Sequence, residues 1–391
     1  MKPDISSLVL VATIAAAAPL IGHVLGRWVS VPLVVFEILL GILFGPQGTG
    51  WIVADPYIGF VSTLGMTMLF LLAGYELDFA RIRGRPLRRS SVGWLGSVAL
   101  GVLLGVLLAP TTAAGVMVGI CLTSTALGTI MPVLRDAGQL GTPFGTTVTA
   151  IGAVGEFGPL LAVALFLSGR SPAAESVLLL VFAALIAVSL VLAVRPEVAR
   201  VHRLIEATLH TSGQFAVRLI VLVLAAFTGL ASAFGLDVLL GAFAAGVLIR
   251  LLLRTGEAAE VEVVEAKLDG LGFGFLVPVF FIYTGVTFDL DALFSSWTTV
   301  ALLPTFLLLF VLVRGIPATV AAPRGAGLAE RAAIALFAAT GLPIIVAVTT
   351  IGLDHGDLSR STAAALVGAG MLSVLVFPLV ALSVARRTRR R

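Results

Sequence analysis

Long apolar segments recur along the whole chain, separated by short polar loops. Each segment is close to the roughly 20 residues that a helix needs to cross the hydrocarbon core of a bilayer. The first segment is long enough to span, which favours a membrane helix over a cleavable signal peptide. The pattern therefore predicts an all-α membrane protein with about 13 transmembrane helices, at residues 5–25, 31–49, 57–79, 91–110, 112–134, 143–168, 173–194, 213–233, 236–254, 270–288, 296–320, 328–352 and 361–385.

Composition supports this reading and excludes several other classes. The chain is 59% hydrophobic and 12% charged, whereas soluble domains carry roughly 25% charged residues. A single cysteine, Cys121, rules out a disulfide within the chain, and the four histidines show no metal-ligand spacing. No nucleophile–base pair, GxGxxG motif or phosphate loop stands out. We therefore expect no enzyme, no cofactor and no fused soluble regulatory domain, so that residues 1–391 form one transmembrane domain.

The distribution of basic residues predicts the orientation in the membrane. An odd number of spans places the two termini on opposite sides, and cytoplasmic loops are enriched in Lys and Arg. If the C-terminus is cytoplasmic, the outer side holds only Lys2, Arg170 and Arg360 of the 25 basic residues. The membrane therefore explains the basic pI of about 9.8 better than a nucleic-acid partner does.

Thirteen spans also divide as six, one and six. Spans 1–6, within residues 5–168, and spans 8–13, within residues 213–385, would then be two repeats of inverted topology, with residues 173–194 as a linker helix. This is the plan of transporters whose coupling ions bind on broken helices at the interface between the repeats. The hydropathy pattern therefore favours a secondary transporter.

Two spans at matching positions carry residues that favour a broken helix. The fifth span of the first half contains Thr123-Ser-Thr-Ala-Leu-Gly-Thr-Ile-Met-Pro132, with Gly128 and Pro132 as helix-breaking residues. The fifth span of the second half contains Gly341 and Pro343. Glycine, proline and hydroxyl residues together allow a membrane helix to unwind where it lines a cavity. We expect both helices to unwind and cross, and a simple kink is the alternative.

One acidic residue, Glu156, lies in the apolar segment Ile151-Gly-Ala-Val-Gly-Glu-Phe-Gly-Pro-Leu-Leu-Ala-Val-Ala-Leu-Phe-Leu167. A carboxylate at that depth costs about 2.5–3.5 kcal/mol to insert, so it usually marks an ion or proton pathway. The alternative is a structural carboxylate that locks the bundle. Glu37 is a second embedded acid, which we expect to lie at an interface or to pair with a nearby basic residue.

Five motifs are similar to those of monovalent cation:proton antiporters of the sodium/hydrogen exchanger superfamily. They are Leu39-Leu-Gly-Ile-Leu-Phe-Gly-Pro46, Phe70-Leu-Leu-Ala-Gly-Tyr-Glu-Leu-Asp78, Thr123-Ser-Thr-Ala126, Gly241-Ala-Phe-Ala-Ala-Gly-Val-Leu248 and Pro278-Val-Phe-Phe-Ile-Tyr-Thr-Gly-Val-Thr-Phe-Asp289. Each motif is weak alone, but five in the right order form a strong signal. The resemblance covers essentially the whole chain.

The resemblance implies roles for particular residues. The sixth span of that family carries a polar pair, Asp-Asp or Asn-Asp in well-studied branches, whose second member binds ion and proton. Glu156 matches the second position and Gly155 the first. A basic residue of the eleventh span faces the pair in the family, and Arg314 matches it. Hydroxyls of the broken helix are candidates to complete an oxygen shell for the cation, and they belong to Thr123, Ser124 and Thr125.

The implied activity is antiport of Na⁺, or of K⁺ or Li⁺, against H⁺ by elevator-like movement of spans 4–6 and 11–13. The family also implies a homodimer in the plasma (inner) membrane, with the N-terminus outside. Gly155 offers no side chain, so the single acid Glu156 predicts electroneutral exchange. Two alternatives are a sensory relative with a permanent Glu156–Arg314 pair and a sodium-coupled organic-anion transporter. Residues 250–269, rich in Glu, predict either an amphipathic surface helix or a solvated linker.

Overall fold

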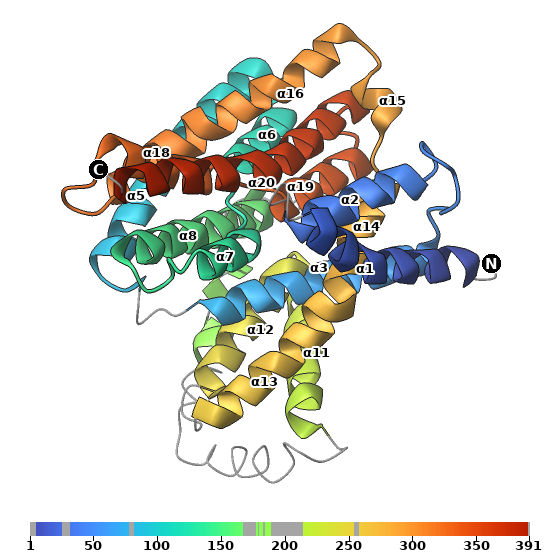
Figure 1. Cartoon of the computed structure of the whole chain (residues 1–391), viewed down its shortest axis with the longest axis horizontal. Coiled ribbons are helices and arrows are strands. Elements are labelled where there is room, and N and C mark those ends of the chain that lie inside the picture. Colours follow the sequence, from blue (N-terminus) through green and yellow to red (C-terminus); the bar gives the residue numbers. More distant parts are fainter. Residues whose placement is uncertain are drawn as a thin grey trace. The chain divides into compact units, whose positions relative to one another are not determined.

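The computed structural model describes residues 5–25, 32–77, 82–166, 177–178, 180–182, 184–188, 214–253 and 258–389. Every regular element in these residues is helical (Figure 1). Within these ranges, ten helical stretches are long and apolar enough to cross a membrane, and two shorter apolar helices accompany them. The predicted all-α membrane fold is therefore confirmed, while the expected linker helix at 173–194 lies mostly outside the described residues.

The chain divides into two compact units. The first unit comprises residues 1–55, 79–162 and 281–391, and the second comprises residues 56–78 and 163–280. Elements of the first unit are α1 (Ile5–Leu25), α2 (Leu33–Phe44), α5 (Arg85–Leu108), α6 (Thr112–Thr123), α7 (Leu127–Asp136), most of α8 (Pro143–Phe166), α15 (Leu290–Leu293), α16 (Trp297–Leu309), η3 (Phe310–Gly315), α17 (Ile316–Ala318), η4 (Thr319–Ala321), α18 (Leu328–Ala338), α19 (Pro343–Asp354) and α20 (Arg360–Arg389). The second unit contains α3 (Pro56–Glu76), α11 (Phe215–Ala233), α12 (Val238–Leu253), α13 (Ala258–Leu271) and η2 (Gly272–Leu276), while α14 (Val277–Val286) runs from the second unit into the first.

Two spans are interrupted, as the sequence predicts. The helix direction breaks between α6 and α7 at residues 124–126, and between α18 and α19 at residues 339–342. Gly341 lies in the second break, and Pro343 is the first residue of α19, where its missing N–H leaves no helical bond unmade.

The expectation that Gly128 and Pro132 interrupt the helix was wrong, because both lie inside α7 and the break precedes them. Pro132 lacks the N–H that would bond the carbonyl of Gly128, yet α7 continues past it to Asp136. The helix instead stops where the backbone N–H groups of Thr125 and Ala126 find partners outside their own helix.

Glycines explain how the helices of the first unit approach one another. A Cβ atom on Gly41 of α2 would collide with the carbonyl oxygen of Ile282, and one on Gly285 with that of Ile38. Small residues of this kind let membrane helices pack backbone to backbone. The first and last of the five motifs therefore pack against each other.

The second unit contains a similar crossing. A Cβ atom on Gly74 of α3 would meet the carbonyl oxygen of Phe243 in α12, and one on Gly246 would meet that of Leu71. The contact joins the second and fourth motifs. The glycines of these motifs are thus required for close helix packing, since any larger side chain at their positions would force the backbones apart.

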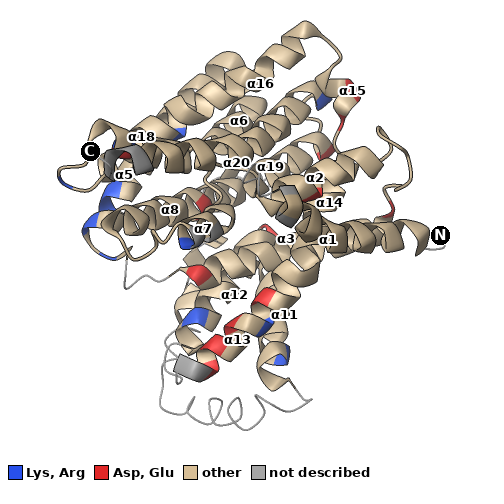
Figure 2. Ribbon diagram, viewed as in Figure 1, with Lys and Arg blue, Asp and Glu red and all other residues tan. Residues whose placement is uncertain are grey.

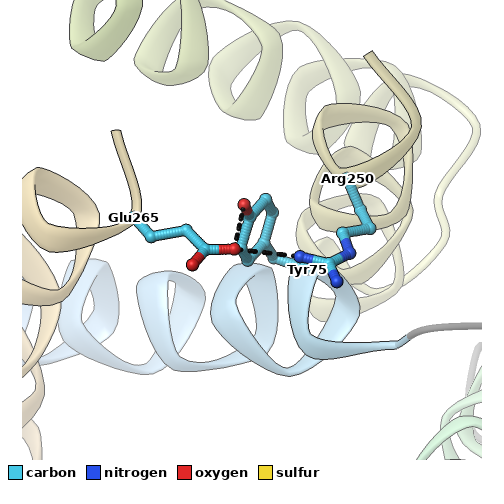
Figure 3. Close-up of polar contacts among 3 residues, drawn as sticks. All are labelled: Tyr75, Arg250 and Glu265. Carbon is cyan, nitrogen blue, oxygen red and sulfur yellow. Dashed lines mark hydrogen bonds and ion pairs between the residues drawn. The ribbon is translucent and has the colours of Figure 1, made fainter. Parts of the chain in front are cut away.

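A polar cluster joins three helices of the second unit (Figure 3). The Tyr75 hydroxyl donates to a carboxylate oxygen of Glu265 at 2.8 Å, and Nη1 of Arg250 lies 2.9 Å from the same oxygen. The Arg250 guanidinium also lies over the Tyr75 ring, 5.2 Å from its centroid. The side chains of Arg250 and Glu265 are 31% and 39% exposed, so the ion pair contributes little stability and mainly orients α13.

Residues 258–271 are helical, and their helix continues without a break into the next span. α13 continues through the π-helical segment η2 into α14, and the helical stretch Glu260–Val286 contains an apolar segment long enough to cross a membrane. Residues 258–269 of the segment that was predicted as an amphipathic surface helix or a solvated linker are thus helical, and their placement at the membrane surface stays a prediction.

Candidate functional site

The first break brings three hydroxyl residues together, but only one reaches beyond its own helix. The hydroxyls of Thr123 and Ser124 donate to the carbonyl oxygens of Ile120 and Cys121, each at 2.9 Å. They thereby satisfy carbonyls at the C-terminal end of α6, which the helix itself leaves without partners. These two side chains shape the end of α6.

Thr125 connects the break to two other helices. Its backbone N–H donates to the carbonyl oxygen of Gly155 in α8 at 2.8 Å, and its hydroxyl donates to that of Ala338 in α18 at 2.6 Å. The Gly155 carbonyl lacks its usual helical partner because residue 159 is a proline without an N–H. Pro159 therefore leaves in α8 the acceptor that the unwound segment uses.

The two breaks contact each other directly. The backbone N–H of Ala126 donates to the carbonyl oxygen of Thr340 at 2.8 Å. Backbone groups of an unwound segment need partners when they are buried, and here each break supplies one to the other. The predicted crossing of the two broken spans is thus observed within the first unit.

Ser373 of α20 anchors the second break and was missed by the sequence analysis. Its hydroxyl oxygen accepts the backbone N–H of Gly341 at 3.1 Å and lies within donating distance of the carbonyls of Gly341, at 3.1 Å, and Gly370, at 2.7 Å. The side chain is completely buried. A lone serine in an apolar span is common, so the sequence offered no signal that would have distinguished it.

Replacing Ser373 by alanine should lower the free energy of unfolding by about 1–3 kcal/mol, because the buried N–H of Gly341 loses its partner. Thermal unfolding in detergent can follow this through Cys121, the chain's only cysteine, which is buried and becomes reactive to a thiol dye on unfolding. Ser383→Ala is the matched control, since Ser383 is exposed on the same helix and donates only to Val380. Equal melting temperatures for the two variants would contradict this role for Ser373.

Glu156 lies beside the N-terminal end of α7. Its side chain is 1% exposed, and Oε2 accepts the backbone N–H of Leu127, the first residue of α7, at 3.1 Å. A helix N-terminus carries a partial positive charge, so a carboxylate there is stabilised. The crossing therefore holds the one acid that the sequence places deep in the sixth span.

Arg314 lies beside the other half of the crossing. It belongs to the π-helical segment η3 and is fully buried, so its side chain does not extend toward a membrane surface. Nε donates to the hydroxyl oxygen of Thr125 at 2.8 Å, and Nη2 donates to the carbonyl oxygen of Ile151 at 2.7 Å. Nη1 has no hydrogen-bond partner in the described part of the chain. A buried guanidinium with a spare donor is unusual and points to a functional role.

The charges match the ends of the half-helices. Glu156 faces the N-terminus of α7, whereas Arg314 contacts Thr125, whose hydroxyl bonds the last carbonyl of α18. Each charge thus compensates the partial charge of one half-helix, as in transporters with broken crossing helices. Glu156 and Arg314 are both hydrogen-bonded to the same short segment, residues 125–127. A direct Glu156–Arg314 pair stays a prediction.

The site offers oxygen atoms and a single carboxylate. Among the described residues, no group of three or more His, Cys, Asp or Glu side chains could hold a metal ion. Figure 2 shows that the helices are mostly free of charged residues. Hydroxyl, carbonyl and carboxylate oxygens suit a small hard cation, and a carboxylate also accepts a proton. The arrangement can therefore hold either a small cation or a proton.

Comparison with known proteins supports the motif-based assignment. The chain is 26% identical over 396 residues to the putative Na(+)/H(+) antiporter YjbQ of Bacillus subtilis, covering 96% of this chain and 62% of that relative. It is 24% identical to a Na(+)/H(+) antiporter of Enterococcus hirae, covering 95% of each protein, and 26% identical to the Na(+)/H(+)-K(+) antiporter GerN of Bacillus cereus, covering 89% and 88%. The chain thus spans less than two thirds of YjbQ but nearly the full length of the Enterococcus protein.

The fold is shared with a solved structure. The sodium proton antiporter MjNhaP1 of Methanocaldococcus jannaschii superposes with a TM-score of 0.70 at 14% identity, covering 98% of both chains. A family model described as the transmembrane sodium/hydrogen exchanger matches residues 9–384. That match spans nearly the entire sequence, and it includes both broken helices, Glu156 and Arg314. The chain therefore belongs to the sodium/hydrogen exchanger family.

Proposed function

We propose that the protein is a secondary antiporter that exchanges one monovalent cation for one proton at Glu156, with Na⁺ as the first candidate for the cation. The observation that carries this proposal is a carboxylate, 1% exposed, at the meeting point of two broken membrane helices. Relatives named as Na(+)/H(+) antiporters support Na⁺, and the relative named as a Na(+)/H(+)-K(+) antiporter keeps K⁺ as a second candidate.

Exchange requires a group that binds either partner but never both. A carboxylate carries one negative charge, which a proton or a monovalent cation neutralises. In our proposal, oxygen atoms of the unwound residues 124–126 and 339–342 complete the coordination of the cation. When either partner is bound, the site carries the same charge, so both loaded states can cross the membrane equally.

Alternating access then requires the crossing to face each side of the membrane in turn. In our proposal the helices that carry the crossing, spans 4–6 and 11–13, move together in an elevator-like manner. The orientation follows from the loop charges, with the C-terminus in the cytoplasm and the protein in the plasma membrane. The working form is a homodimer in this scheme.

Purified protein in liposomes with a preset proton gradient and an internal pH dye tests this function. Na⁺, Li⁺ and K⁺ are added in turn, and we expect Na⁺ to release the gradient. Because one carboxylate carries one charge, the rate should not change when a K⁺ diffusion potential is imposed with valinomycin. A rate that follows the voltage would reject one-for-one exchange.

Absence of proton movement with all three cations over a wide pH range would reject antiport. It would favour a sensory protein in which Glu156 and Arg314 form a permanent pair, or a transporter of organic anions coupled to sodium. Binding of Na⁺ without proton release, measured on the same preparation, would favour the sodium-coupled transporter of organic anions over the sensory protein.

A further inference from the structure

Gly155 precedes Glu156 in α8, and the space where its side chain would lie is already filled. A Cβ atom built at residue 155 would lie 2.5 Å from the hydroxyl oxygen of Thr125 and 2.7 Å from its Cβ, and would also collide with Nη2 of Arg314. Real Cβ atoms essentially never come within 3.0 Å of such neighbours. The guanidinium therefore occupies the volume that any side chain at this position would need.

The guanidinium is held in that volume from two directions. Nη2 donates to the carbonyl of Ile151, one helical turn before Gly155, and Nε donates to Thr125. Both acceptors lie on the segments that enclose residue 155. Because the donor–acceptor distances are 2.7 and 2.8 Å, a displacement of about one ångström away from them would break both hydrogen bonds.

The backbone that carries Arg314 has little room to retreat. A Cβ atom on the next residue, Gly315, would lie 2.8 Å from the carbonyl oxygen of Ala335, so η3 already packs against α18 at backbone distance. Val313, on the other side, is completely buried. A side chain at residue 155 would therefore force the guanidinium to move, together with the Thr125 side chain to which it is hydrogen-bonded.

We propose that Gly155 is the specificity-determining position of the site: its missing side chain admits the Arg314 guanidinium, which thereby becomes the second charged group of the crossing. The effect on ion specificity rests on the proposed function, whereas the packing of Arg314 against Gly155 does not. The site then contains one carboxylate and one fixed cation, whose Nη1 is buried without a hydrogen-bond partner among the described residues. A second bound cation is disfavoured by that charge, which limits the load to one monovalent ion.

The geometric part is tested by a double-mutant cycle in thermal unfolding, with thiol-dye labelling of Cys121 as the readout. Gly155→Ala should lower the melting temperature of the wild-type protein. It should do so less in an Arg314→Ala background, because the collision with the guanidinium is gone and only the one with the Thr125 side chain remains. Arg314→Lys serves as a milder second background, since lysine lacks the planar fork that reaches Ile151.

Gly152→Ala is the matched control for this cycle. Gly152 is buried on the same helix, and the nearest neighbours of its Cβ would all belong to the side chain of Leu127, the closest at 2.6 Å. Its effect should therefore add to that of either Arg314 substitution. If Gly155→Ala and Arg314→Ala are also additive, the guanidinium does not depend on the glycine, and the proposal is overturned.

The functional part is tested in the same liposomes as the exchange. Gly155→Ala should shift the cation concentration for half-maximal exchange by about tenfold or more, since moving a buried charge by a few ångströms changes the local potential strongly. Gly152→Ala should shift it much less than Gly155→Ala does, because its closest neighbour is the flexible end of the Leu127 side chain and not a charged group. An unchanged half-maximal concentration in Gly155→Ala would overturn the assignment of specificity. If the wild type does not exchange at all, the proposed function fails, while the unfolding cycle still decides whether Gly155 makes room for Arg314.

Discussion

Glu156→Gln is expected to reduce cation-driven proton movement to the leak of protein-free liposomes. Glutamine keeps the length of the side chain and an oxygen that can accept the N–H of Leu127, so the end of α7 retains its partner. The amide neither binds a proton near neutral pH nor neutralises a cation. The variant therefore removes the exchange chemistry while it leaves the crossing intact, and its melting temperature should stay close to that of the wild type.

Glu37→Gln is the matched control for this experiment. Glu37 is the other buried glutamate in the part of the chain that the structure describes, 2% exposed in α2, and α2 lies outside the two broken spans. We expect this variant to exchange with a rate similar to the wild type. If both glutamine variants abolished exchange, a mechanism with a single acid would be wrong, and transport would require two carboxylates with a correspondingly different stoichiometry.

Thr125→Val is expected to destabilise the protein by about 2–4 kcal/mol, because valine keeps the shape of threonine but removes two buried hydrogen bonds at once. One of them involves the charged guanidinium of Arg314, and the other closes the C-terminal end of α18 at Ala338. Hydrogen bonds to charged groups contribute more than neutral ones, so most of the loss should come from Arg314. The melting temperature in detergent and the exchange rate should fall together.

Thr349→Val provides the comparison, since Thr349 is 2% exposed and belongs to α19, the second half of the other broken helix. Its hydroxyl bonds only to carbonyls of its own helix, at Ile345 and Val346. We expect a loss below about 1 kcal/mol, because both carbonyls keep their helical partners. A loss as large as that of Thr125→Val would show that any buried hydroxyl of these helices matters equally.

The five motifs illustrate how far sequence reasoning reached. They indicated the family through order and spacing, yet the reason for their glycines lies in contacts between motifs. Gly74 and Gly246 belong to one helix crossing, and Gly41 and Gly285 to another. A sequence shows that a residue is small, but it does not show which distant backbone approaches it.

The break positions show a different limit. Glycine and proline indicated which spans unwind, and both spans are indeed interrupted. The interruption in the first half lies at residues 124–126, before Gly128 and Pro132, because the N–H groups of Thr125 and Ala126 find their partners in α8 and in the second break. Where a helix stops inside a membrane depends on which groups satisfy its free N–H and C=O groups, and those partners are remote in sequence.

The sequence alone determined the membrane-spanning class, the two interrupted spans and Glu156 as the isolated acid, because hydropathy and the cost of a buried charge are local properties. The tertiary structure alone decided the rest of the site. Thr125 bonds to Arg314, which lies 189 positions away in the chain, and to Ala338, which lies 213 positions away. The absence of a side chain at Gly155 matters because the guanidinium of Arg314 lies against it. Such contacts depend on how the helices pack, which no local pattern records.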